Sequence, residues 1–316
     1  MNKKRIALIV VEAGLLVMTI FLITRIYEQK TPEKRIAVIV PNSGDEGWDF
    51  ILKGMKEAAN ANDIHLIICN TSDIESAQTQ AELIREQRDN NVNGFIIYPA
   101  PGEKTEKMLE EECSGLPYLL IVQDVYSSDQ ENVVVQPDNY KMGYFLGEQM
   151  KQDDANGLEG KSIGIVAGFE KNAQTKECEA GFLDAVGESG CSISWTYEKQ
   201  KEKNFLDEWD SFSKVDYLAV LDWDLLDDIS EEAEEKEIAL YGIGNSMKDI
   251  SLLDKGKIEA ISVTDYYALG YESVGEVAKK LENRFYTMKS YEVSTRIIGK
   301  DELTLQDIER FIYSYE

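Results

Sequence analysis

The sequence predicts an α/β protein of two similar lobes, each built around a parallel β-sheet. From residue 34 onward, short apolar runs rich in β-branched residues alternate with longer amphipathic segments, which is typical of strand–helix–strand units. The pattern occurs twice along the chain, and 316 residues are enough for two lobes. A hydrophobic content of 43%, with 16 Tyr and 10 Phe, is sufficient for a packed core and argues against a disordered acidic chain.

The first half supplies five strands and at least two helices. Its apolar runs predict strands at residues 36–40, 65–69, 94–98, 118–122 and 133–136. Between the first two strands, apolar residues from Trp48 to Ala59 recur at helical spacing, and Ala81 and Ile84 indicate a second helix. We assign residues 34–137, together with 266–288, to lobe 1.

The second half repeats the pattern. Strands are predicted at residues 162–167, 191–195, 217–221, 238–241 and 260–263, with a helix at 173–186. We assign residues 138–265 and 289–300 to lobe 2.

The remaining C-terminal elements are a helix at residues 268–281, a strand at 293–298 and a terminal helix at 304–315. No Ser/Gly-rich run or proline-rich stretch separates the halves, so we expect several short strands to join the lobes as a hinge.

Residues 1–30 differ in composition from the rest. Three basic residues precede residues 6–24, in which Glu12 is the only charge. Nineteen residues rise about 28 Å as a helix, close to the thickness of a bilayer core, so we predict a cytoplasmic tip and one transmembrane helix. Residues 31–316 would then form an extracytoplasmic domain held at the cell membrane. The alternative is an atypical cleaved signal peptide.

Charge and residue types exclude several classes of function. The 33 Lys and Arg against 59 Asp and Glu give a formal net charge of −26, which argues against binding to nucleic acid. His65 is the only histidine, so neither a Ser-His-Asp triad nor a multi-histidine metal site can form. The four cysteines lack CxxC spacing and are interpreted as buried thiols or, alternatively, one disulfide. We therefore expect no enzyme activity, cofactor or metal.

An ordered series of motifs resembles the ribose-type (type I) periplasmic sugar-binding proteins. The series begins with the strand and turn at residues 36–41, the Asp-Glu-Gly-Trp at 45–48 and the helix at 52–59. It continues at residues 93–99, in the Pro-Asp-Asn at 137–139 and in the helix at 180–185. The resemblance covers about residues 35–298 and identifies the chain as a divergent, membrane-anchored member. It implies two Rossmann-like lobes that close around a small ligand at the carboxyl ends of their strands.

On lobe 1, the resemblance implies a ligand contact at Asp45 and an aromatic ring that stacks on a sugar at Trp48. Trp48 alternatively packs in the core of its helix. Gln123 and Asp124 follow the fourth strand, where the family usually has Asp-Arg, so the chain departs from the family by lacking the arginine.

On lobe 2, Lys176 matches a family arginine, with an exposed surface lysine as the alternative. Asp222 and Trp223 follow the strand at 217–221, where Asp222 alternatively caps a helix. Asn245 follows the strand at 238–241, beside Gly244, which replaces a family aspartate. Asp265 lies in the hinge and alternatively caps the helix that follows it.

These observations predict a solute-binding protein that captures a small polar ligand, most readily a sugar, and performs no chemistry on it. The many acidic residues near the cleft favour a cationic or amino-bearing ligand over an anion. The expected partner is either an ABC permease or a sensor histidine kinase. The alternative is a scaffold subunit of a membrane signalling complex that binds no ligand.

Overall fold

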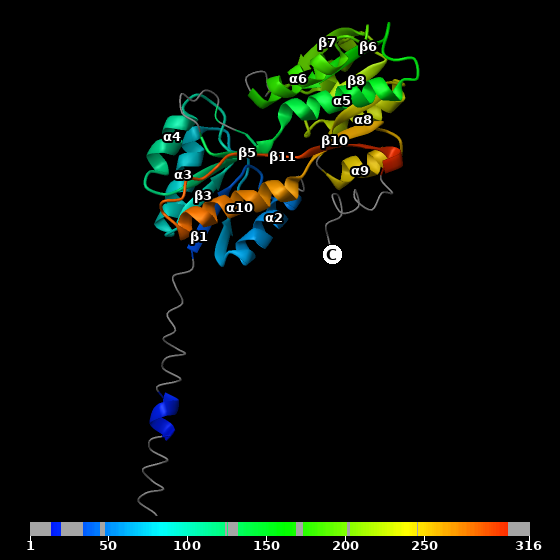
Figure 1. Ribbon diagram of the computed structural model, residues 1–316. Coiled ribbons are helices and arrows are strands. Elements are labelled where there is room, and N and C mark those ends of the chain that lie inside the picture. The colour runs from blue at the N-terminus through cyan, green and yellow to red at the C-terminus, as the bar shows by residue number, and fades with distance from the viewer. Residues whose placement is uncertain are drawn as a thin grey trace, which may run out of the picture.

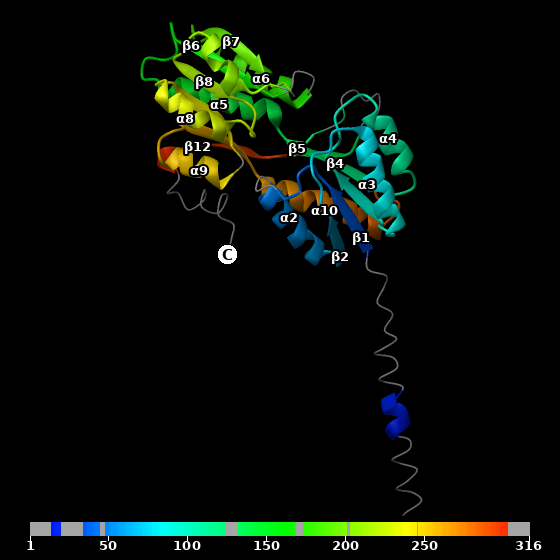
Figure 2. The same cartoon turned by 180° about the vertical axis from the view of Figure 1, so that it is seen from behind.

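The computed structural model describes residues 14–19, 34–44, 48–123, 125, 132–168, 173–200, 203–244 and 246–302. Two lobes, each with a six-stranded sheet between helices, make up the fold. Figures 1 and 2 show the lobes side by side, and Figure 1 labels β5, β10 and β11 near their junction. The predicted two-lobed α/β architecture is confirmed.

Lobe 1 contains a sheet in the order β11-β5-β4-β3-β1-β2, in which all strands are parallel. Its strands are β1 (Lys34–Ile39), β2 (Ile64–Ile68), β3 (Gly94–Ile97), β4 (Tyr118–Ile121), β5 (Val134–Pro137) and β11 (Tyr291–Val293). Helices α2 (Asp49–Ala61) and α10 (Tyr266–Glu282) pack on one face, and α3 (Ala77–Asp89) and α4 (Thr105–Glu112) pack on the other. Alternate residues of β1 enter the two cores, because successive strand side chains point to opposite faces.

Lobe 2 contains a sheet in the order β12-β10-β9-β8-β6-β7, with only β12 antiparallel to its neighbour. Its strands are β6 (Ser162–Ala167), β7 (Ser192–Glu198), β8 (Tyr217–Val220), β9 (Ala239–Gly244), β10 (Ala260–Thr264) and β12 (Thr295–Gly299). Helices α5 (Asn139–Asp153) and α6 (Ala173–Val186) cover one face. The other face is covered by α7 (Phe205–Glu208), α8 (Leu226–Glu235), α9 (Met247–Asp254) and the short 3-10 helix η2 (Trp209–Ser211).

The chain crosses between the lobes three times, as the expected multi-strand hinge requires. The crossings run from β5 to α5, from β10 to α10 and from β11 to β12. The sequence predicts one strand at residues 293–298, but the structure divides it at Ser294 into β11 and β12, which belong to different sheets. The Ser294 carbonyl accepts a hydrogen bond from the Asp265 backbone N–H at 3.0 Å, so two crossings are joined at this residue.

In each lobe, two helices cross in close contact at a glycine residue. In lobe 1, Gly270 of α10 faces the Ile51 backbone of α2; in lobe 2, Gly143 of α5 faces the Cys178 backbone of α6. A Cβ atom at either glycine would collide with the facing carbonyl oxygen. The absence of a side chain therefore allows each helix pair to approach backbone to backbone.

The predicted membrane anchor is not supported. Of residues 6–24, the structure describes residues 14–19, which are helical. Across the described part of the chain, no helix has both the length and the apolar character that a membrane span needs. The prediction of a single-pass anchor in the cell membrane is therefore wrong. The rest of residues 6–24 and the predicted helix at 304–315 lie outside the described residues.

Candidate ligand-binding site

A cavity of about 150 Å³ lies between the lobes, at the carboxyl ends of strands from both sheets. Lobe 1 contributes Tyr98 and Gln123, which follow β3 and β4, and lobe 2 contributes residues that follow β7 and β8. Drug-sized ligands occupy pockets of about 300 to 1,000 Å³, so this cavity suits a smaller molecule. Parallel sheets place loops and helix starts at this edge, which is where α/β proteins bind ligands.

Aromatic rings form one wall of the cavity. The Trp223 and Tyr266 rings stack with centroids 5.7 Å apart and an interplanar angle of 29°. Trp48 lies behind them, with its ring edge-on to Trp223 at 6.2 Å and to Tyr98 at 5.8 Å. Such faces match the apolar C–H surface of a small ring-shaped ligand.

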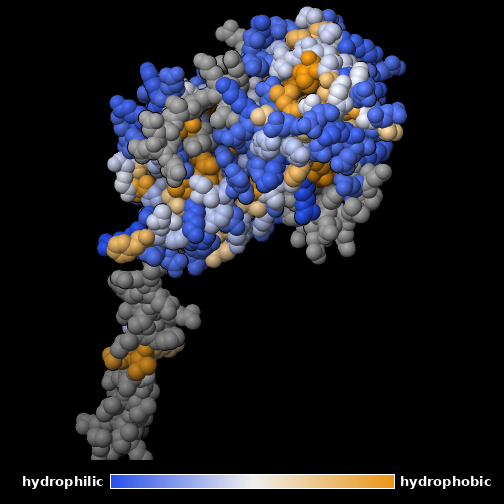
Figure 3. Space-filling model, turned by 45° about the horizontal axis from the view of Figure 1, so that its top comes forward, coloured by the Kyte–Doolittle hydropathy of each residue, from blue (hydrophilic) through white to orange (hydrophobic). Residues whose placement is uncertain are grey.

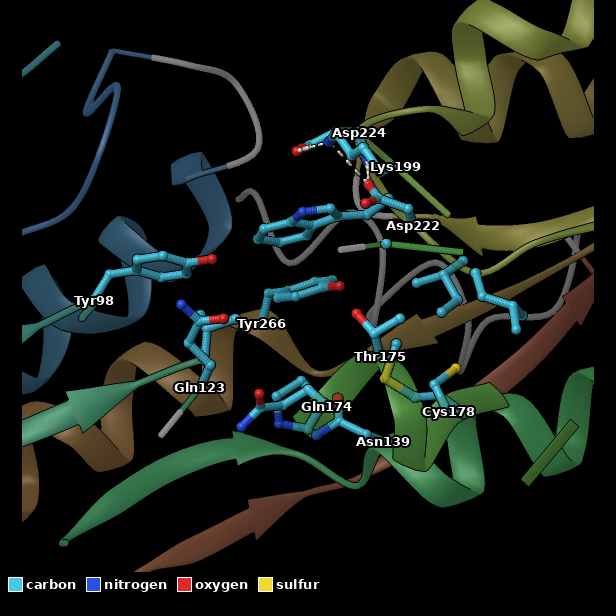
Figure 4. Close-up of a pocket in the computed structure, with 17 residues that line it drawn as sticks. Tyr98, Gln123, Asn139, Gln174, Thr175, Cys178, Lys199, Asp222, Asp224 and Tyr266 are labelled. Carbon is cyan, nitrogen blue, oxygen red and sulfur yellow. Dashed lines mark hydrogen bonds and ion pairs between the residues drawn. The ribbon is translucent and has the colours of Figure 1, made fainter. Parts of the chain in front are cut away.

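A charged cluster lies beside the aromatic wall (Figure 4). The Lys199 ammonium is 3.5 Å from the Asp222 carboxylate and 3.1 Å from that of Asp224. Burial raises the pKa of Asp222, and the Lys199 charge opposes that rise. Burial alone would lower the pKa of Lys199, but the two carboxylates raise it, so the lysine stays protonated. With two acids around one cation, the cluster does not present a free positive charge to an anionic ligand.

Amide side chains line the wall below the aromatic rings (Figure 4). The Gln123 Nε2 donates to the Pro99 carbonyl at 3.4 Å. The Asn139 Nδ2, at the start of α5, is buried and has no hydrogen-bond partner among the described residues. A buried donor without a partner is costly, and a ligand hydroxyl that accepts from it removes that cost. Gln174 and Thr175 of α6 add further polar groups.

The structure brings three of the nine predicted site residues to the cavity: Gln123, Asp222 and Trp223. Trp48 is only 6% exposed and packs in the core of lobe 1, in contact with the cavity wall and not part of the lining. Lys176 is exposed at the surface of α6.

Asp265 caps α10, since its carboxylate accepts from the Ala268 backbone N–H at 2.8 Å. Asp45, Asp124 and Asn245 lie outside the described residues. The roles of all nine in ligand binding stay predictions.

Lys199 is a cavity residue that sequence reasoning missed. The strand prediction ended at residue 195, but β7 continues to Glu198 and places Lys199 directly at its carboxyl end. The last three residues of β7, Thr-Tyr-Glu at 196–198, do not continue the apolar run on which the prediction relied. They are tolerated in the strand because β7 lies at the edge of the sheet and is largely exposed.

Tyr98 and Tyr266 were also missed. Tyr98 was predicted as the last residue of the strand at 94–98, whereas β3 ends at Ile97, and Tyr266 directly follows the hinge residue Asp265. Their positions at the end of a strand and after the hinge are the signal that could have found them.

The described side chains of the cavity supply aromatic, amide and charged groups for binding. Within the described ranges, no group of three His, Cys, Asp or Glu side chains is placed to hold a metal ion. Cys178 lines the cavity as a free thiol, and burial raises its pKa to about 12, so it is not a nucleophile at neutral pH.

Two α/β lobes, three crossings and an interlobe cavity define the class of two-lobed ligand-binding proteins. The family described as "Periplasmic binding protein domain" matches residues 36–284, most of the chain, and the chain belongs to this family. Members of the family are substrate-binding proteins and not enzymes. The resemblance to type I periplasmic sugar-binding proteins is confirmed.

Known proteins similar to the chain include both regulators and transport proteins. Curated proteins named HTH-type transcriptional repressor PurR, from strains of Actinobacillus pleuropneumoniae, are 25% identical over 168 residues, which is 52% of this chain and 47% of theirs. The chain thus spans about half the length of the curated relatives it matches.

The solved structures that share the fold include two with informative descriptions. A carbohydrate transporter solute binding protein from Agrobacterium radiobacter, in complex with D-arabinose, is 15% identical with a TM-score of 0.77, covering 90% of this chain and 100% of that chain. A XylFII-LytSN complex is 18% identical with a TM-score of 0.69, covering 85% and 98%. At these identities the likeness shows the fold alone.

Proposed function

We propose that this chain is an extracytoplasmic solute-binding protein that captures a small sugar by closure of its two lobes. The observation that carries the proposal is the interlobe cavity. There the Trp223–Tyr266 stack lies beside the buried Asp222 carboxylate and the buried Asn139 Nδ2, which has no hydrogen-bond partner among the described residues. Stacking faces and hydrogen-bonding groups are the combination that a monosaccharide needs. The D-arabinose bound to the Agrobacterium neighbour supports this ligand class.

The partner of the closed form is an ABC permease or a membrane sensor kinase. The transporter binding protein from Agrobacterium supports the first, and the complex formed by XylFII with LytSN supports signalling through a protein partner. Neither partner needs the chain to bind nucleic acid, which a net charge of −26 disfavours.

The experiment is thermal unfolding of the protein with pentoses, hexoses, inositols, amino sugars and polyamines. A ligand that binds only the native state stabilises it by about 2.7 kcal/mol at a hundredfold excess over Kd, which raises the unfolding midpoint by several degrees. We expect Asp222→Ala to abolish the shift, because it removes the buried acceptor. Glu231→Ala, which removes an exposed carboxylate of α8 in the same lobe, is the matched control and should leave the shift unchanged.

If none of these compounds raised the unfolding midpoint, the result would contradict sugar capture and favour the scaffold role. Tight binding of a sugar phosphate or a dicarboxylate would contradict the electrostatic part of the proposal, because the cavity's one described cation is already paired with two carboxylates.

A further inference from the structure

The side chain of Trp223 bridges the two lobes. Its backbone follows β8 of lobe 2, yet its ring stacks on Tyr266 of α10 and meets the edge of Trp48 before α2. Both of these residues belong to the core of lobe 1. Trp223 packs against that core and also against the core of lobe 2 between its sheet and α5 and α6. The indole is therefore shared by two hydrophobic cores that the hinge allows to separate.

The turn that carries Trp223 is held firmly on lobe 2. The Asp222 carboxylate accepts from the Asp224 backbone N–H at 2.9 Å, and the Asp222 carbonyl accepts from the Leu225 N–H at 3.2 Å. Lys199 at the end of β7 contacts the acids on both sides of the tryptophan. Since the turn is fixed, opening the lobes must withdraw the indole from Tyr266 and Trp48.

The same ring also limits the space in the cleft. Trp223 lines the cavity, and its contact with Tyr266 closes one wall of a volume of only about 150 Å³. A larger ligand would need the place that the indole now fills.

We propose that Trp223 is a bridge between the lobes that holds them together without ligand and restricts the cleft to a monosaccharide-sized molecule. The size restriction rests on the proposed sugar binding, whereas the bridge does not. Separation of the lobes exposes the apolar faces of Trp223, Tyr266 and Trp48 to water, so the ring contacts favour closure before any ligand enters. Ligand binding then requires a smaller shift in the population of closed molecules, which strengthens the apparent affinity.

The bridge is tested in the ligand-free protein by the distance between spin labels on the two lobes. Labels at Lys107→Cys on α4 and Asp210→Cys in lobe 2 use side chains that are 81% and 90% exposed, with the half-buried Cys191 replaced by serine. We expect Trp223→Ala to give a longer and broader distance distribution, and Trp223→Phe to lie between it and the native chain. Phe285→Ala, which removes an aromatic ring that is 78% exposed on lobe 1, is the control and should leave the distribution unchanged.

An unchanged distribution in a Trp223→Ala protein that still unfolds cooperatively would overturn the bridge. For the size restriction, Trp223→Ala should be stabilised less by a monosaccharide, because a stacking face is lost, and should no longer prefer the monosaccharide to its disaccharide as the native protein does. Equal stabilisation of the native protein by a monosaccharide and its disaccharide would overturn that part. If no sugar stabilises any variant, sugar capture fails, while the label distances still decide whether the bridge exists.

Discussion

At the scale of single residues, the charge state of Asp222 links the cavity to pH. Its side chain is only 10% exposed, and burial raises its pKa although the Lys199 ammonium opposes the rise. The ionised carboxylate accepts hydrogen bonds from a ligand more strongly than the neutral acid does. Binding is therefore favoured above the pKa of Asp222 and weakens as the pH falls through it.

We expect ligand-induced stabilisation to decline on acidification at a pH above the range of about 4 in which ordinary carboxyl groups titrate. Thermal unfolding with and without ligand between pH 7 and pH 4 measures the decline. Asp222→Asn should remove this pH dependence together with part of the affinity. Asp216→Asn is the control, because hydrogen bonds from Ser162 lower the pKa of Asp216 and it lies outside the cavity. A decline that persists unchanged in Asp222→Asn would contradict the assignment.

At the scale of elements, the glycine crossings set how closely paired helices pack. Gly270 faces the Ile51 carbonyl of α2, whereas Gly275 of the same helix has nothing within 4 Å of an added Cβ. A substitution at Gly275 therefore tests helix propensity alone, whereas one at Gly270 also tests the packing of α10 against α2.

We expect Gly270→Ala to lower the free energy of unfolding by about 1 to 3 kcal/mol, because the added methyl pushes α10 away from α2. Gly275→Ala should raise it by about 0.5 to 1 kcal/mol, since alanine loses less backbone entropy in a helix. Urea unfolding of the two variants measures both effects. Equal effects of the two substitutions would show that the crossing is not the cause.

A second element-scale feature is the carboxylate of Glu276, which ties α10 to the segment that leads into β11. Its side chain is fully buried and accepts hydrogen bonds from four donors. These are the Lys279 ammonium at 2.7 Å, the Lys289 backbone N–H at 2.9 Å, the Tyr286 hydroxyl at 3.0 Å and the Tyr291 hydroxyl at 3.2 Å. Burial alone would raise the pKa of Glu276, but these donors hold it below its ordinary value. The stabilisation is thus present above the ordinary pKa of a glutamate and is lost as the pH falls through the lowered one.

Glu276→Gln should cost about 1 to 3 kcal/mol at pH 7, because an amide leaves some of the buried donors without an acceptor. Chemical denaturation at pH 7 and at pH 3 measures the loss, which should shrink at the lower pH as the native carboxylate protonates. Glu282→Gln, at the exposed end of the same helix, is the matched control. A loss of equal size at both pH values would argue against the charge as its source.

At the scale of the whole molecule, the sequence was sufficient to predict the two-lobed architecture but not to predict many of the residues that line the cavity. Buried strands such as β6 are continuous apolar runs, so they were found with correct bounds. The exposed edge strand β7 was shortened, which hid Lys199. Contacts between residues far apart in the chain, such as Trp223 with Tyr266, depend on how the lobes meet, and no local pattern encodes them.

The surface agrees with the composition. The face shown in Figure 3 is mainly hydrophilic, with apolar residues confined to smaller areas. Salt screens the repulsion among exposed charges that a net charge of −26 implies.

The crossings between the lobes also affect the order in which the protein is completed during synthesis. Lobe 1 begins with β1, but its helix α10 and its edge strand β11 come from residues 266–293, after most of lobe 2. Figure 1 shows the consequence in colour, with blue α2 lying beside orange α10. Lobe 1 is therefore the first to leave the ribosome, but it receives its last helix and its edge strand only after most of lobe 2 has been synthesised. Until α10 has been synthesised, the apolar side of α2 that it covers is exposed to water, and such exposed surface favours aggregation of the nascent chain.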